Sequence, residues 1–177
     1  MGWESGREAA RFLDKNPRVG SPYVIDYQAV FRFAVPPGAM WTELERLDSF
    51  AEWWRWLRDF RHEGGGLRTG AVLSGTVVPP LPYRMRVRVV LDDCVAPSRI
   101  DATVLGDLEG HAHLRLEPLD RGTQATVSWT IEMRQRPMRL AALVAHPLLR
   151  WGHDRVVDAT VSSFRRHLPA SGALEQP

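Results

Sequence analysis

Two side chains in this sequence are candidates for acid–base chemistry, His153 and Tyr27. His153 falls on an apolar stripe whose members recur at three- and four-residue steps, as on one face of a helix. An imidazole there could exchange a proton with a bound ring system, because its pKa lies near neutrality. Tyr27 lies on the inward face of an expected strand and adds a hydroxyl group. The alternative for His153 is a buried histidine whose nitrogens are satisfied by a neighbouring polar group.

The remaining reactive residue types do not form a site in the sequence pattern. His111 and His113 are two positions apart and share one face of a strand, as a metal-binding pair would. They share that face with Arg115 and Glu117, and no third ligand is evident. We therefore predict no metal ion and no cofactor. Cys94 is the single cysteine, which excludes a disulfide within the chain, and no nucleophile motif of a serine or cysteine hydrolase is present.

The longest apolar segment runs from about Pro137 to Leu168 and would position His153. From Pro147 onward it is predicted to be one amphipathic helix, because proline is tolerated in a first helical turn. One face carries the apolar stripe, made of Leu149, His153, Val156, Val157, Thr160, Val161, Phe164 and Leu168. About 22 helical residues span about 33 Å, so this helix needs a broad apolar surface to pack against.

Alternating patterns between Tyr23 and Met133 predict that surface to be an antiparallel sheet. Tyr23–Val35 is the first strand, with Tyr27, Phe31 and Phe33 pointing inward. Later strands alternate in the same way; in 84–91 the arginines are expected to point outward, into solvent. One of these strands is expected to run from Ile100 to Leu108, with a turn at Gly110. Short turns without intervening helices indicate a meander that is wet on one face.

A pair of short helices is expected between the first strand and the meander. Met40, Trp41, Leu44 and Leu47 have helical spacing, and Asp48-Ser49 could cap a second helix. That second helix would carry Trp53, Trp54, Trp56, Leu57 and Phe60. The tryptophans either pack the helical pair against the sheet edge or, for Trp53 and Trp56, line the mouth of a cavity.

Composition excludes several classes of protein. The 177 residues, 44% of them hydrophobic, suffice for one well-filled core. The 23 basic residues are dispersed and nearly balanced by 21 acidic ones, so nucleic-acid binding is not predicted. No apolar run reaches the roughly 20 residues of a membrane span, and the first residues lack the apolar core of a signal peptide. The cytoplasm is the expected location.

The order of elements resembles the START/Bet v 1-like (SRPBCC) superfamily, in particular bacterial polyketide cyclase/dehydrase-like proteins, from about Tyr23 to Leu168. The similarity rests on turns, glycines and core aromatics: Val35-Pro36-Pro37 leading into Met40-Trp41, then Trp53-Trp54, Leu105-Gly106-Asp107-Leu108-Glu109-Gly110, Gly122-Thr123 before a strand with Trp129, and Trp151-Gly152-His153-Asp154. Such markers identify a fold better than an activity.

The resemblance implies an α+β, helix-grip fold: a curved antiparallel sheet of six to seven strands around a long C-terminal helix, with two short helices after the first strand. The expected organisation is an N-terminal arm (1–22), one domain (23–168) and a C-terminal tail (169–177). An apolar cavity between sheet and helix would bind a hydrophobic small molecule, such as a lipid, a polyketide, a quinone-like compound or another aromatic.

The alternatives are an aromatase/cyclase-type enzyme that uses the same cavity, with His153 and Tyr27 as candidate catalytic groups, an interaction protein that uses the tryptophan-rich edge, or a filled core with no cavity. The expected ligand-binding residues are Phe31, Phe33, Trp53, Trp56, Met85, Val87, Val89, Val104, Trp129, Ile131, His153, Val157, Thr160 and Val161.

Overall fold

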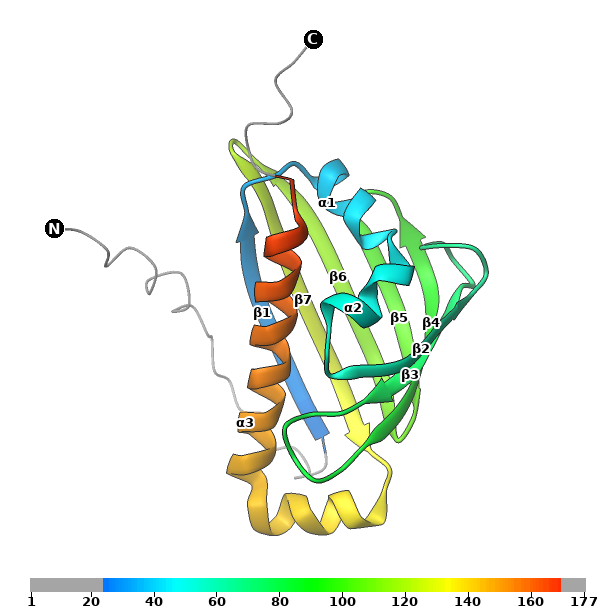
Figure 1. Cartoon of the computed structure of the whole chain (residues 1–177), viewed down its shortest axis with the longest axis vertical. Helices are drawn as coiled ribbons and strands as arrows, with labels where there is room; N and C mark the ends of the chain where they lie inside the picture. Colours follow the sequence, from blue (N-terminus) through cyan, green and yellow to red (C-terminus); the bar gives the residue numbers. More distant parts are fainter. Residues whose placement is uncertain (1–23, 170–177) are drawn as a thin grey trace, which may run out of the picture.

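Seven strands form one antiparallel sheet, and the helices lie on one of its faces (Figure 1). This computed structural model describes residues 24–169, and for residues 136–150 it describes the backbone alone. The elements follow one another in this order: β1 (Val24–Phe33), α1 (Pro37–Leu44), the 3-10 turn η2 (Leu47–Ser49), α2 (Phe50–Trp53), β2 (Leu57–Glu63), β3 (Val72–Val77), β4 (Met85–Val95), β5 (Arg99–Gly106), β6 (Leu108–Leu119), β7 (Gly122–Met133) and α3 (Arg136–His167).

The predicted fold class is confirmed. The strand order β1-β7-β6-β5-β4-β3-β2 is a continuous meander from β2 to β7, with β1 added at the far edge beside β7. Short turns permit only antiparallel neighbours, which is why the six later strands are adjacent in chain order. The predicted arm (1–22) and nearly all of the predicted tail (169–177) lie outside the described residues. Among the described helices, none is long and apolar enough to cross a membrane.

The long helix begins earlier than the sequence pattern predicts. It starts at Arg136, so Pro147 lies in its interior rather than in its first turn. Figure 1 shows the helix turning sharply between its yellow and orange parts. A proline in a helix interior cannot donate the usual backbone hydrogen bond and commonly bends the helix there.

The predicted second short helix is wrong in its extent. α2 ends at Trp53, and Leu57 and Phe60 belong to strand β2. A short apolar run is compatible with both the helical repeat of 3.6 residues and the two-residue repeat of a strand. In addition, a bulge around Asp59, whose φ is +50°, interrupts the alternation that would identify the strand. Asp48 and Ser49 lie in the 3-10 turn, where no side-chain cap is formed.

The turn between β5 and β6 lies at Asp107 rather than at Gly110. Gly106 has φ +115°, a left-handed conformation that favours glycine, and a Cβ there would collide with the Arg86 carbonyl. Asp107 then fixes the turn, because its Oδ2 accepts a hydrogen bond from the Arg86 backbone N–H at 2.6 Å. Gly110 falls inside β6, opposite Val104 and Ile131.

Candidate functional site

Three aromatic rings meet on the concave face of the sheet, beneath α3. Tyr27 on β1 and Trp129 on β7 are direct cross-strand partners, and their ring centroids are 4.4 Å apart with planes inclined by 22°. His153 on α3 packs edge-on against both rings, with centroids at 4.9 Å from Tyr27 and 5.3 Å from Trp129. We call this cluster of Tyr27, Trp129 and His153 the aromatic end of the interface between the sheet and α3.

Two buried nitrogen atoms in the aromatic end lack a hydrogen-bond partner. These are Nε1 of Trp129 and Nε2 of His153, each shielded from solvent with no partner among the described residues. The other ring nitrogen of His153, Nδ1, lies 3.2 Å from Asp154 Oδ1. If Nδ1 carries the proton, Nε2 has a lone pair without a donor. An indole N–H and an imidazole nitrogen are therefore left without a hydrogen-bond partner among the described residues.

Small side chains lie next to the aromatic rings in the same cross-strand row. Trp129 pairs with Ala112 on β6, Ala112 pairs with Ala102 on β5, and Ala102 pairs with Leu91 on β4. Ala102 and Leu91 are buried, whereas Ala112 is only half-buried, as are Tyr27 and Trp129. The concave face is thus incompletely covered beside the aromatic rings, where two methyl-sized side chains follow a tryptophan.

Partial burial also changes the pKa of the Tyr27 hydroxyl group. Partial burial, with the negative charges of Asp154 and Asp158 adding to it, raises the pKa of Tyr27 to about 12. The phenol therefore stays neutral and able to donate a hydrogen bond throughout the physiological range. Burial likewise raises the pKa of the Cys94 thiol, with smaller contributions from Asp93 and Glu45, so this cysteine is not an activated nucleophile.

The other predicted ligand-binding residues divide between two packed clusters. Trp53, Trp56, Phe31, Phe33 and Val161 belong to the cluster around Phe33, Leu116, Ala125 and Phe164. We call this region, defined by Phe33, Leu116, Ala125 and Phe164, the filled end of the interface between the sheet and α3. Trp129 belongs to a second cluster together with Met85, Val87, Val89, Val104 and Ile131. As contacts for a ligand, these residues remain a prediction.

Val157 and Thr160, both on the predicted apolar stripe of α3, differ in how their polar and apolar groups are used. Val157 is half-buried. Thr160 forms two hydrogen bonds: its hydroxyl donates to the Val156 carbonyl at 2.7 Å, and its backbone carbonyl accepts from Trp54 Nε1 at 3.3 Å. Trp54 was not singled out from the sequence, yet it ties α2 to α3 across 106 positions of the chain.

A groove on the outer flank of α3 was also missed by the sequence pattern. It has a volume of about 560 Å³ and lies between α3, the α2–β2 junction and the end of β3 with the loop that follows. Trp53 and Trp56 line it, together with Arg55, Arg155 and Arg166. The arginines carry no distinguishing signal in the sequence, since an exposed helix face normally carries charges.

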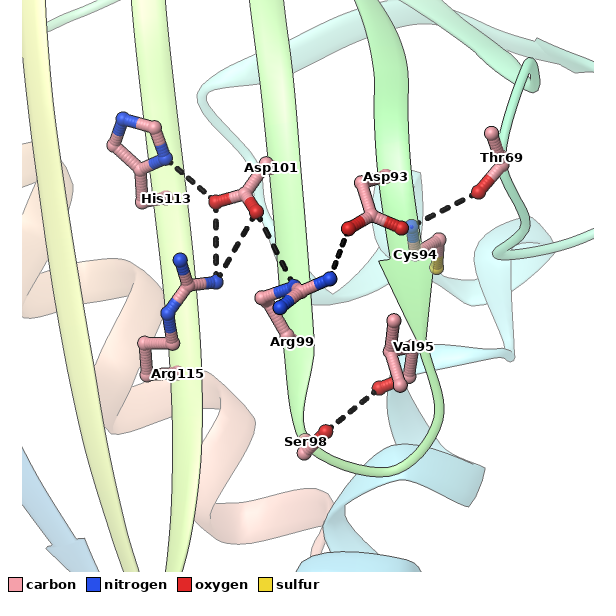
Figure 2. Close-up of polar contacts among 9 residues, drawn as sticks. All are labelled: Thr69, Asp93, Cys94, Val95, Ser98, Arg99, Asp101, His113 and Arg115. Atoms are coloured by element: carbon pink, nitrogen blue, oxygen red, sulfur yellow. Dashed lines mark hydrogen bonds and ion pairs between the residues drawn. The ribbon is translucent and has the colours of Figure 1, made fainter.

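The convex face of the sheet holds a polar network rather than a metal site (Figure 2). Asp101 accepts from His113 Nδ1 at 2.7 Å and from Arg115, and Arg99 joins Asp101 to Asp93. The hydrogen bond from His113 lowers the pKa of the Asp101 carboxyl most; burial opposes it, and the hydrogen bond and charge of Arg115 add to the lowering. No group of three metal-ligating side chains occurs among the residues that the structure describes.

Comparison with known proteins identifies the fold. No family model matches the sequence, and no curated protein matches it significantly. Among solved structures, the protein TTHA0849 from Thermus thermophilus aligns with a TM-score of 0.65 and 13% identity, covering 84% of this chain and all of that one. Ara h 8.0201 aligns with a TM-score of 0.57 and 17% identity over 81% of this chain and 99% of that one.

An aromatase/cyclase is a further structural neighbour. Zhui aromatase/cyclase from Streptomyces sp. R1128 aligns with a TM-score of 0.63 and 18% identity, covering 85% of this chain and 99% of that one. At such identities the likeness concerns the fold and does not transfer an activity. The resemblance inferred from the sequence is confirmed at that level: the described chain has the fold shared by Bet v 1-like proteins and polyketide aromatase/cyclases.

Proposed function

We propose that the protein binds a hydrophobic small molecule between the sheet and α3, at the aromatic end. The single observation that supports this most is the pair of buried, unpartnered nitrogens on Trp129 and His153. Leaving a buried polar group unpaired costs about 1–3 kcal/mol, and a bound carbonyl or hydroxyl group would recover that cost. A lipid, a polyketide, a quinone-like compound or another aromatic offers such a group on an apolar body.

The half-buried inner face supports the same proposal. Ala112, Val87 and Val89 keep part of their surface uncovered although they pack in the same cluster as Trp129, whereas a protein interior normally packs to crystal density. Tyr27 and Trp129 supply flat apolar walls for a ring or an acyl chain. The single cysteine, Cys94, is compatible with a reducing compartment, and we propose the cytoplasm as the location.

The test uses N-phenyl-1-naphthylamine, a neutral aromatic whose fluorescence rises in apolar surroundings. Ala112→Leu fills the space beside Trp129, and His111→Leu on the convex face of the same strand is the matched control. We expect Ala112→Leu to weaken binding at least about tenfold and His111→Leu to leave it unchanged. Native mass spectrometry of the purified protein would identify a retained compound. A parent protein that neither binds the probe nor retains a compound would contradict the proposal.

A second candidate function is supported by the His153–Asp154 contact. Asp154 Oδ1 lies 3.2 Å from His153 Nδ1, an arrangement that leaves Nε2 as a possible general base facing a bound molecule. The chain would then be an enzyme of the aromatase/cyclase type. His153→Ala and Tyr27→Phe separate the two functions. Turnover that collapses in these variants while probe binding persists would favour the enzyme; full binding with no turnover by the parent would favour the carrier.

A further inference from the structure

The groove on the outer flank of α3 has an apolar and aromatic middle. Trp54 and Trp56 stack with ring centroids 5.8 Å apart and planes inclined by 15°, and both line the groove. Pro79 and Pro80, which follow β3, form the facing wall. Trp56 also brings a buried Nε1–H that has no partner in the described part of the chain. These surfaces suit a flat ring system or an acyl chain.

The helix side of the groove is built from small residues between two arginines. Arg155, Ala159, Ser162 and Arg166 follow one another at steps of four, three and four, so they lie along one stripe of α3. The two small side chains leave space between the arginines, whose backbone positions are about 16 Å apart along the axis. His153 lies on a different face of the helix, against Tyr27 and Trp129. None of Tyr27, Trp129 and His153 lines the groove.

The groove is positively charged. Arg55, Arg155 and Arg166 line it and are exposed, and no ion pair to any of them is formed among the described residues. The described lining contains no acidic residue. The nearby acids of α3, Asp154 and Asp158, are not among the residues that line the groove.

The arginines of the network on the convex face differ from those of the groove, because they are ion-paired. Arg99 and Arg115 are both paired with Asp101 (Figure 2). The three arginines of the groove have no such partner among the described residues, although Arg155 lies with its guanidinium carbon 5.9 Å from the Trp151 ring centroid. Unneutralised guanidinium groups beside an apolar surface are suited to an anionic group attached to an apolar body.

We infer that this groove is a second binding site, which takes an amphipathic organic anion: an aromatic or acyl body that carries a carboxylate, sulfonate or phosphate. The body lies on Trp54 and Trp56, and the acid group pairs with the arginines at the rim. The volume of about 560 Å³ is within the usual range for small-molecule sites. This site is distinct from the proposed cavity, and either can exist without the other.

Two probes that differ by one acid group test the inference. 8-Anilinonaphthalene-1-sulfonate and N-phenyl-1-naphthylamine share their ring system, and the first adds a sulfonate. The groove variant is Arg155→Gln with Arg166→Gln; the control, Arg86→Gln with Arg88→Gln, removes the same charge from exposed positions on the convex face. We expect the groove variant to lower affinity for the sulfonate about tenfold and the neutral probe to change less than about twofold. The control should change neither.

A single substitution provides an independent check. Ser162→Glu places a negative charge in the groove at an exposed position, and it should weaken sulfonate binding while leaving the neutral probe unaffected. An equal loss of sulfonate affinity in the groove variant and in the convex-face control would overturn the inference, because it would reflect net charge alone. Unchanged sulfonate affinity in both the double arginine variant and Ser162→Glu would also overturn the inference.

The indole N–H signals in NMR spectra distinguish this site from the proposed cavity. Sulfonate binding should shift the Trp54 and Trp56 signals, assigned with Trp54→Phe and Trp56→Phe, before the Trp129 signal. If the sulfonate shifts only Trp129, the groove is not its site and the inference fails, while the cavity proposal stands. If Trp54 and Trp56 shift but no neutral probe reaches Trp129, the cavity proposal fails and the groove remains.

Discussion

The two ends of the interface between the sheet and α3 are built from the same helix and the same strands, yet they are packed differently. At the filled end, Phe33 and Phe164 pack edge to face at 6.0 Å, and both are almost fully buried. Two buried hydroxyl groups near it are paired: Thr123 Oγ1 donates to the Val35 carbonyl at 2.6 Å, and Ser163 Oγ to the Trp53 carbonyl at 2.7 Å. Trp56 Nε1, at the margin of the same cluster, has no partner among the described residues.

The aromatic end is less completely buried. Tyr27 and Trp129 are half-buried, and the ring nitrogens Nε1 of Trp129 and Nε2 of His153 have no partner among the described residues. Proteins normally satisfy their buried polar groups, and this chain does so a few residues away on the same helix. We therefore expect stability to be concentrated at the filled end, whereas the proposed function assigns binding to the aromatic end.

The largest expected effect comes from removing a ring at the filled end. Phe164 is 4% exposed and contacts the rings of both Phe33 and Trp53. Phe164→Ala should lower the free energy of unfolding by about 3–5 kcal/mol, through lost burial and a residual cavity. Urea denaturation measures this. Val157→Ala, at a half-buried position on the same helix, should cost clearly less; equal losses would remove the distinction between the ends.

A smaller loss is expected from unpairing a buried carbonyl. Ser163 is 3% exposed, and its hydroxyl is bonded to the Trp53 carbonyl. Ser163→Ala should therefore cost about 1–3 kcal/mol of unfolding free energy, measured by the same denaturation experiment. Ser162→Ala is the matched control, since Ser162 is exposed, and it should leave stability nearly unchanged. Indistinguishable midpoints for the two variants would show that the bond contributes little.

Replacing a tryptophan should have opposite consequences in the two settings. Trp129→Phe removes an N–H that has no partner among the described residues, so the unfolding free energy should change by less than about 1 kcal/mol, while probe binding weakens. Trp41 is 4% exposed and donates from Nε1 to Glu45 at 3.0 Å. Trp41→Phe should cost more stability and leave probe binding intact. The reverse ranking would contradict the assignment of binding to the aromatic end.

The smallest effect concerns alkaline pH. The Tyr27 pKa, about 12 in the folded protein, lies above the usual value near 10. Below pH 10 the phenol is neutral in both states, so it adds no pH dependence. Between pH 10 and 12 only the unfolded state ionises, so the unfolding free energy falls as pH rises. Tyr27→Phe should remove this part of the loss.

Phenolate absorbance provides the measurement. The difference between the titrations of the parent and of Tyr27→Phe isolates this residue among the three tyrosines. Burial also raises the pKa of Tyr83, so Tyr83→Phe is the appropriate comparison. A Tyr27 phenol that ionises near its usual value would mean that the aromatic end is well hydrated.

The sequence was sufficient for most of the fold because the strands of the meander alternate cleanly and their turns are short. It also placed Tyr27, Trp129 and His153 on inward faces, from periodicity alone. It could not show that these three rings meet, because their contact depends on β1–β7 pairing and on the position of α3. Strand β2 was missed because the bulge at Asp59 breaks its alternation.

The groove was beyond the reach of sequence patterns for a different reason. Arg155 and Arg166 look like ordinary surface residues, and their significance depends on which segments pack nearby. Gly152 shows how close the loop after β3 comes: a Cβ there would lie 2.5 Å from Leu81 Cδ1. Such proximity between residues distant in sequence arises only when the chain is folded.

The pairing of β1 with β7 has a consequence for synthesis of the chain. The Thr130–Asp26 hydrogen bond across these strands joins residues 104 positions apart. β1 is therefore synthesised well before its hydrogen-bonding partner β7, and its apolar face, with Ile25, Phe31 and Phe33, stays unpaired meanwhile. Contacts this distant along the chain slow folding, and unpaired strands favour aggregation. Translation of the segment up to Met133 sets the earliest moment at which this edge of the sheet can close.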